Sequence, residues 1–377
     1  MNSVYIIAAR RTAVVPRGGA FAQHEVYGLG SRVIEASLCD SGLSPHDVDN
    51  VVMGNALYGG GNPARLAALA AGLPETVPAM TIDTQCCAGL DAINTACSMV
   101  AMGAAQVVVA GGLESYSRAP IRQHRPKRKG DEPIDYVRPP FTPWPRRDPD
   151  MLESASELAR RRGVSREMQA EFAILSHKKA LEAASNEPEI AKLCGVHKDL
   201  FTRKLSPPVC ARAAILSGDS NTGLTAATVA VEADAAAAVV VVSEEILKRT
   251  SPVGRAIGVI THCSVGSDPS MPSTAPIAAV EKMLRSAQAD PSELRVAEVM
   301  EAFAVQAMVC IGDCRIDPAS VNRGGGALSR GHPIGASGAI LGVRLWSELQ
   351  SEESGALGIA TIAAAGGLGS AALWKAQ

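Results

Sequence analysis

Residues 322–338 read NRGGGALSRGHPIGASG, and this stretch says most about how the chain folds. Four glycines precede His332, and glycine permits close backbone approach and unusual φ values. Pro333 restricts the turn that follows, so we expect His332 to lie in a constrained turn ahead of a helix. A histidine held in this way can take a proton from a thiol or donate a hydrogen bond to a thioester oxygen. The alternative is a structural histidine, which is the commoner role of a lone one.

A second informative stretch, residues 81–90, reads TIDTQCCAGL and places two thiols just before an expected helix. The free amides and partial positive charge of a helix N-terminus stabilise a thiolate and can bind the oxyanion of a tetrahedral intermediate. Cys86 or Cys87 is therefore a candidate nucleophile. The alternative is that both are buried cysteines that act as small hydrophobic residues.

Composition limits the class of protein. The chain has 377 residues, more than one hydrophobic core usually organises. Aromatic residues make up only 3% while there are 35 glycines, which suits helices packed closely on sheets. The net charge of -2 favours neither nucleic acid nor a membrane surface as a partner. Nine scattered cysteines without a C-x-x-C pair indicate reduced thiols in a cytoplasmic protein and lack the spacing of a zinc site. We expect no metal and no other cofactor.

Short apolar runs alternate with amphipathic stretches, which predicts βα units with largely parallel central strands. The expected strands are Val51–Met53, Val107–Ala110, Val239–Val242 and Leu357–Ala364, after a first strand from Tyr5 to Ala9 that Arg10 and Arg11 end. The expected helices are Tyr27–Ser41, Gly89–Met102, Arg166–Ala184, Ile277–Ala287 and Ala336–Leu349.

The domain organisation follows from a change in amino-acid composition after Ser115. Residues 118–149 are rich in Pro, Arg and Lys without periodicity, which predicts an inserted loop domain over 116–219. The flanking units are an N-terminal α/β half over 1–115, completed by about 220–248, and a C-terminal α/β half over 249–377. Cys86–Gly112 and His332–Gly367 resemble each other weakly, which hints at an internal duplication.

Taken together, these stretches resemble the thiolase family, including acetyl-CoA acetyltransferases and 3-ketoacyl-CoA thiolases, along nearly the whole chain. The matching motifs are AARRTA at 8–13, NPAR at 62–65, AGGLES at 110–115, EAF at 301–303 and GHPIGASG at 331–338. The resemblance implies an α/β thiolase fold: two duplicated halves with a layered αβαβα core and an inserted loop domain. It also implies a homodimer or homotetramer that uses acyl-CoA, with an acyl-carrier protein as the alternative donor.

The resemblance also assigns roles to particular residues. It implies that Cys86 carries the acyl group, that His332 activates it, and that the backbone amides of Cys86 and Ala365 bind the oxyanion. The residues it implies for the acyl pocket are Met151, Met271, Met300 and Phe303. Acyl chain length and the identity of the acceptor are not visible in the sequence.

Two catalytic positions depart from the family pattern. Met300 stands where the family has a water-holding asparagine, and Ala363 where it has a second cysteine; a looser alignment places Ala230 at a CoA-contacting serine. We therefore predict transfer from Cys86 to an acceptor that needs no carbanion, such as an amine, hydroxyl, thiol or water. One alternative is an ordinary acetyl-CoA acyltransferase with substitute groups, and another is an inactive scaffold subunit. The nearest substitutes by sequence are Cys87, His262, Cys263 and Cys310.

The run Arg122–Lys129 is strongly basic. It could meet the phosphates of CoA or an acidic carrier protein. The alternative is a solvated loop face.

Overall fold

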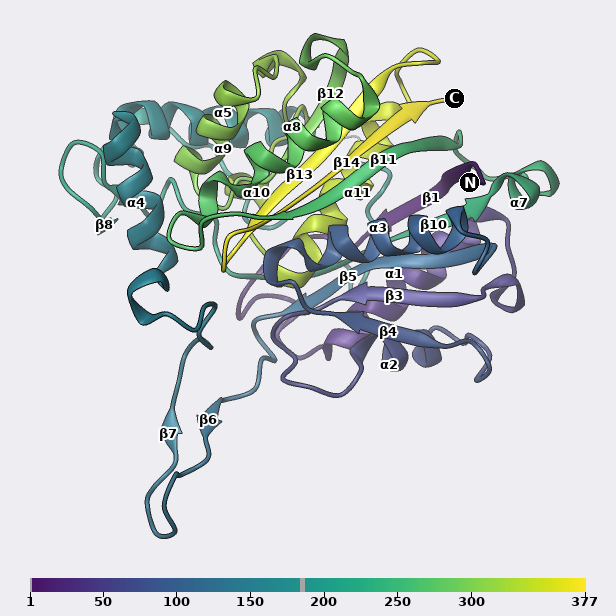
Figure 1. Cartoon of the computed structure of the whole chain (residues 1–377), viewed down its shortest axis with the longest axis horizontal. Helices are drawn as coiled ribbons and strands as arrows, with labels where there is room; N and C mark the ends of the chain where they lie inside the picture. The colour runs from purple at the N-terminus through teal and green to yellow at the C-terminus, as the bar shows by residue number, and fades with distance from the viewer. Residues whose placement is uncertain (1, 184–186) are drawn as a thin grey trace.

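The computed structural model describes residues 2–183 and 187–377, and in this part of the chain the main strands join in one ten-stranded sheet (Figure 1). The strand order is β12-β13-β14-β11-β1-β10-β5-β3-β4, with short β2 paired to β10. The N-terminal half supplies β1 (Val4–Arg11), β2 (Val15–Pro16), β3 (Asn50–Gly54), β4 (Ala79–Ile82), β5 (Val107–Ser115) and β10 (Ala233–Ser243). The C-terminal half supplies β11 (Ile257–Gly266), β12 (Leu294–Val299), β13 (Leu357–Ala364) and β14 (Leu368–Ala376).

The helices form three layers around the two halves of this sheet, which confirms the predicted αβαβα arrangement. Helices α3 (Ala88–Ala101) and α11 (Ile334–Leu349) share the inner core with both halves. Outer layers are formed by α1 (Val26–Ser41) and α2 (Pro63–Ala70) on one half, and by α8 (Ala275–Ala287) and α9 (Ala304–Asp313) on the other. The remaining short helices are α7 (Glu244–Arg249), α10 (Ala327–Arg330), η1 (Pro45–Asp47), η2 (Gln85–Cys87), η3 (Pro145–Arg147), η4 (Pro272–Thr274), η5 (Pro291–Glu293) and η6 (Pro318–Ser320).

Residues 235–242 of β10 are all apolar, because this part of the strand is buried on both faces of the sheet. Ala237 and Val239 point into the inner core, while Ala238 and Val240 point into the outer core under α1. Since successive side chains of a strand face opposite sides of the sheet, a strand buried on both faces needs apolar residues throughout.

The expectation of largely parallel central strands was wrong. β10 pairs antiparallel with β1 and with β5, and β14 pairs antiparallel with β11 and with β13. Parallel pairs are confined to β3 with β4, β3 with β5, and β12 with β13 among the described strands. The tight turn at Gly366 and Gly367, both with positive φ, joins β13 directly to β14 and forces them to be antiparallel.

The expected end of the first strand was also wrong. β1 continues through Arg10 and Arg11, and the Arg11 side chain is fully buried. Its guanidinium lies 2.8 Å from a carboxylate oxygen of Asp199 and 3.0 Å from one of Glu187. These buried ion pairs make an arginine compatible with a central strand, and they tie the inserted segment to the sheet.

The chain between β5 and β10 leaves the sheet (Figure 1). It carries β6 (Gln123–His124), β7 (Ile134–Asp135), α4 (Met151–Arg162), α5 (Arg166–Ala183), α6 (Pro207–Ala211), β8 (Ile215–Ser217) and β9 (Leu224–Thr225). The helix expected at Arg166–Ala184 is α5, and its predicted last residue, Ala184, lies outside the described residues. β6 and β7 form a narrow arm that projects from the body of the molecule.

Candidate active site

The two motif regions meet because α3 and α11 touch near their N-terminal ends. A Cβ atom on Gly89 would lie 2.6 Å from the backbone nitrogen of Ala339. A Cβ atom on Gly338 would lie 2.5 Å from the backbone nitrogen of Leu90. Only glycine allows helices to approach this closely, so the glycines of both motifs bring the two helix starts together.

Cys86, in η2 just before α3, faces His332, in the turn before α11. The Nε2 atom of His332 lies 3.2 Å from the Cys86 sulfur, and its Nδ1 atom lies 2.7 Å from Oγ of Ser337. The Ser337 hydroxyl donates its single proton to the carbonyl of Pro333 at 3.0 Å. In that arrangement Ser337 accepts the Nδ1–H bond, and the Nε2 lone pair of a neutral imidazole faces the thiol.

The protonation states follow from burial. Burial raises the pKa of the Cys86 thiol to about 12, although the backbone amides of Cys86 and Ala365 oppose this by donating hydrogen bonds to the sulfur. Burial lowers the pKa of His332 to about 4. Both groups are thus neutral near pH 7, so the thiol can lose its proton to His332 as the sulfur attacks. The two amides are those predicted for the oxyanion hole.

The residue before the nucleophile has an uncommon backbone conformation. Gln85 has a φ of 55°, in the left-handed region that non-glycine residues rarely adopt. The carboxylate of Asp83 stabilises this turn by accepting hydrogen bonds from the Gln85 amide at 2.9 Å and from its side chain at 3.0 Å. Backbone strain of this kind is concentrated at functional sites.

A buried carboxyl group, Glu114, connects the histidine turn to the end of β5. Its oxygens accept hydrogen bonds from the backbone amides of Gly335 and Ala56, both at 3.0 Å, and from the Asn55 side chain at 2.8 Å. Burial raises the pKa of Glu114 to about 7. In the sequence, Glu114 stands out only as part of a motif, so this positioning contact was not predicted.

Tyr116 is a second group that was not predicted from the sequence. Burial raises its pKa well above the ordinary value, and the negative charges that Cys86, Glu232 and Glu114 carry when ionised add to the effect. The hydroxyl is therefore protonated and electrostatically coupled to the nucleophile. No periodicity or spacing in the sequence marks this tyrosine.

The two diverged positions bring no proton-transfer group to the site. Met300 is buried in the inner core, which Cys86 also contacts, and its amide donates to the carbonyl of Thr361 at 3.0 Å. Ala363 is half-buried on β13, opposite Gly369 of β14. A thioether and a methyl group cannot hold a water or move a proton as an amide or a thiol does.

Of the four substitute groups suggested by the sequence, Cys87 adjoins the nucleophile, but its thiol points into the core. Cys87 is almost fully buried, and its sulfur lies 3.5 Å from the carbonyl oxygen of Ile362. It is therefore turned toward β13 rather than toward a bound substrate.

The other three suggested substitutes lie away from Cys86, so nearness in the sequence did not predict nearness to the nucleophile. His262 contacts Ser98 at 3.2 Å, and Ser98 is twelve residues beyond the nucleophile, roughly 18 Å along the helix. Cys263 and Cys310 belong to the outer core beneath α8 and α9. None of these three can act on an acyl group at Cys86.

Three of the four residues predicted for the acyl pocket come together. Met151, Met271 and Phe303 share one apolar cluster between α4 and α9. Met300 packs instead in the inner core, and Ala302 contacts both clusters. Ala230, at the position of the missing serine, donates its amide to the carbonyl of Ala302 at 3.0 Å and so lies against the same loop.

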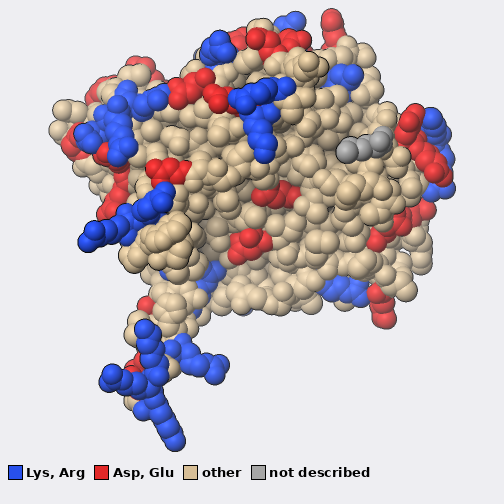
Figure 2. All heavy atoms as spheres, in the orientation of Figure 1, with Lys and Arg blue, Asp and Glu red and all other residues tan. Residues whose placement is uncertain are grey.

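The basic run lies on the arm formed by β6 and β7, and Figure 2 shows its Lys and Arg side chains gathered there. Arg122, at the base of the arm, donates to the carbonyl of Ala56 at 3.2 Å. The other basic side chains, those of Arg125, Lys127, Arg128 and Lys129, are exposed. Within a single chain they extend into solvent, away from the nucleophile.

Neither a metal site nor a membrane span is found in the described part of the chain. Within residues 2–183 and 187–377, no three His, Cys, Asp or Glu side chains are grouped as metal ligands would be. Each helix described is too short or too polar to pass through a lipid bilayer.

Comparison with known proteins places this site in a family. Residues 4–245 match the model of the thiolase N-terminal domain, and residues 254–376 match that of the thiolase C-terminal domain. A Bacillus subtilis (strain 168) protein, provisionally named an acetyl-CoA C-acetyltransferase, is 36% identical over 382 residues, covering 100% of this chain and 99% of its own length.

Two solved structures are similar throughout. The Bacillus anthracis acetyl-CoA acetyltransferase has a TM-score of 0.90 at 30% identity, covering 100% of this chain and 99% of that one. The human mitochondrial 3-ketoacyl-CoA thiolase in complex with CoA has a TM-score of 0.91 at 26% identity, and the match covers 100% of this chain and 98% of that one. With both domain models matched in order and the glycine-framed Cys86–His332 pair at the centre, the chain belongs to the thiolase family.

Proposed function

We propose that the protein is an acyltransferase that takes an acyl group from an acyl-CoA and carries it as a thioester on Cys86. The observation that carries the proposal is the 3.2 Å contact between the Cys86 sulfur and Nε2 of His332, in the tautomer that Ser337 fixes. The names of the relatives, acetyl-CoA acetyltransferase and acyltransferase, support an acyl-CoA rather than a carrier-protein donor. By family resemblance, the proposal includes a homodimer or homotetramer.

Acylation needs only groups that are present. The Cys86 proton moves to Nε2 of His332 as the sulfur attacks the thioester carbonyl carbon, and the carbonyl oxygen becomes an oxyanion that the amides of Cys86 and Ala365 stabilise. The intermediate then expels the CoA thiolate, which takes the proton back from His332. The products are acyl-Cys86 and CoA, and His332 is neutral again.

For the second step, the relatives' names favour an ordinary thiolase reaction: condensation with a second acyl-CoA, or its reverse, thiolysis of a 3-ketoacyl-CoA. Such a reaction needs a group that moves a proton at carbon or at sulfur. His332 contacts the Cys86 sulfur, and the Tyr116 hydroxyl is influenced by the charge of Cys86; we propose that these two groups share this task.

A second candidate, transfer to an amine, hydroxyl, thiol or water without a carbanion, is favoured by Met300 and Ala363. A general acid or base contributes about 10²–10⁴-fold to a rate, and one oxyanion donor about 10²–10³-fold. Without the asparagine and the second cysteine of the family pattern, condensation loses help of this size, whereas acylation of Cys86 does not.

Two assays test the proposal and separate the candidates. Exchange of labelled CoA into acetyl-CoA requires acylation alone; we expect exchange in the wild type and in Cys87→Ala, and none in Cys86→Ala. If the wild type shows no exchange with acetyl-CoA or with longer acyl-CoAs, the acyl-enzyme proposal is wrong and a scaffold role is favoured. Where exchange occurs, thiolysis of a 3-ketoacyl-CoA at a comparable rate supports the ordinary reaction, while exchange without thiolysis supports an acceptor that needs no carbanion.

A further inference from the structure

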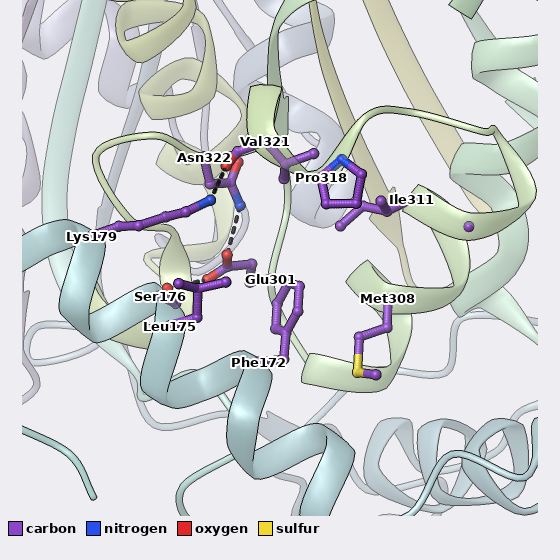
Figure 3. Close-up of a pocket in the computed structure, with 11 residues that line it drawn as sticks. Phe172, Leu175, Ser176, Lys179, Glu301, Met308, Ile311, Pro318, Val321 and Asn322 are labelled. Atoms are coloured by element: carbon purple, nitrogen blue, oxygen red, sulfur yellow. Dashed lines mark hydrogen bonds between the residues drawn. The ribbon is translucent and has the colours of Figure 1, made fainter.

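A cavity of about 300 Å³ lies between α5 and α9, next to η6 (Figure 3). It is distinct from the predicted acyl pocket, because Met271 and Phe303 belong to the cluster between α4 and α9 and do not line it. Most of its wall is apolar and is formed by Phe172, Leu175, Met308, Ile311, Pro318 and Val321.

Polar groups gather at one end of the cavity, and nearly all of them are already paired. The Glu301 carboxylate accepts hydrogen bonds from Ser176 and Asn322, each at 2.7 Å, and from the amide of Leu328 at 3.2 Å (Figure 3). Because its oxygens already accept hydrogen bonds from the protein, Glu301 forms a polar end of the cavity and needs no ligand as a hydrogen-bond partner.

Lys179 is the exception at this end of the cavity. The residue is half-buried, and its ammonium group donates one hydrogen bond, to the carbonyl of Val321 at 2.6 Å. An ammonium group has three N–H donors, and for the other two the described residues supply no acceptor. Burial lowers the pKa of Lys179 even though Glu301 and Glu298 raise it, so the nearby charges compensate only part of the cost of burial.

We propose that this cavity binds a small carboxylate with an apolar tail. The carboxylate would accept the two open N–H groups of Lys179 in a charge-assisted pair, and the tail would lie along Phe172, Met308 and Ile311. Since a water-sized group takes up about 30 Å³, the cavity holds roughly ten non-hydrogen atoms, the size of octanoate. The proposal does not depend on the acyltransferase reaction, so the two can fail separately.

The test is calorimetric titration of octanoate into the wild type and three variants. Lys179→Met removes the ammonium group but keeps the length of the side chain. Gly312→Leu adds a side chain to the cavity wall, because Gly312 lines the cavity and a Cβ atom there meets nothing within 4 Å. Lys178→Met is the matched control, since Lys178 is exposed and paired with Glu182 on the same helix.

We expect saturable binding of octanoate to the wild type and to Lys178→Met. The affinity for octanoate should be about tenfold or more lower in Lys179→Met and in Gly312→Leu. The wild type should bind 1-octanol more weakly than octanoate by a similar factor. Equal affinity in the wild type and in both cavity variants would place octanoate elsewhere and overturn the proposal. Equal affinity for octanol and octanoate, or no saturable binding by the wild type, would overturn it as well.

Discussion

Replacing Ser337 with alanine removes the acceptor that holds Nδ1 of His332 at 2.7 Å. During acylation the neutral imidazole becomes an imidazolium, so this hydrogen bond strengthens as the reaction proceeds. A neutral hydrogen bond contributes about 0.5–1.5 kcal/mol and one to a charged group about 1.5–3 kcal/mol, a difference of about 1–1.5 kcal/mol. Each 1.36 kcal/mol is about tenfold in rate, so we expect Ser337→Ala to slow acylation roughly fivefold to thirteenfold.

The assay is single-turnover acylation by acetyl-CoA, quenched at intervals and measured by intact mass. Ser329→Ala is the matched control, because Ser329, in the neighbouring helix α10, is also buried and donates to a nearby carbonyl, that of Gly326, without touching the imidazole. Its acylation rate should equal that of the wild type. If folded Ser337→Ala acylates as fast as Ser329→Ala, Ser337 does not orient His332, and the tautomer assigned to His332 does not depend on it.

Three further predictions concern pH dependence and stability. Since burial lowers the pKa of His332 to about 4, the acylation rate should stay level down to about pH 5 and fall below it; a decline centred near pH 6.5 would contradict this. Gly338→Ala, whose Cβ would lie 2.5 Å from the Leu90 nitrogen, should lower the free energy of unfolding in urea by about 1–3 kcal/mol or more, whereas Gly312→Ala should leave it equal or raise it by up to about 1 kcal/mol. Burial raises the pKa of Glu298 to about 7, so its contribution to stability is present below about pH 4.5 and lost as pH rises through 7. Glu298→Gln should therefore be more stable than the wild type at pH 8, by up to roughly 3 kcal/mol, and the gap should close toward pH 5; a gap independent of pH would contradict the assignment.

The sequence predicted best those elements whose local pattern is unambiguous. The expected strand Leu357–Ala364 has the bounds of β13, because an apolar run there lies between turn residues. β5 and β10 extend well beyond their expected ends, since Gly111 and Ala235 have poor strand propensity but are fully buried where other segments pack closely. Strand direction was not predictable, because it is set by which strands pair across the fold.

For the site, the sequence provided the two groups that glycine frames, Cys86 and His332, and the structure brings them into contact. The sequence could not show which other residues position these two groups or act on them electrostatically. Ser337 was already within the quoted motif, but its role depends on the direction of one hydroxyl proton. Glu114 reaches the histidine turn from the end of β5, a contact that exists only once the two halves are packed together. Tyr116, the next residue but one, is influenced by the charge of Cys86, which likewise depends on the folded arrangement.

If Cys86 carries the acyl group, incubation with acetyl-CoA should raise the mass of the protein by one acetyl group, located on Cys86 by sequencing of the modified peptide. We expect this increase in the wild type and in Cys87→Ala, and its loss in Cys86→Ala. An acetyl group on Cys87, or an unmodified Cys86 in an enzyme that still exchanges CoA, would contradict this expectation.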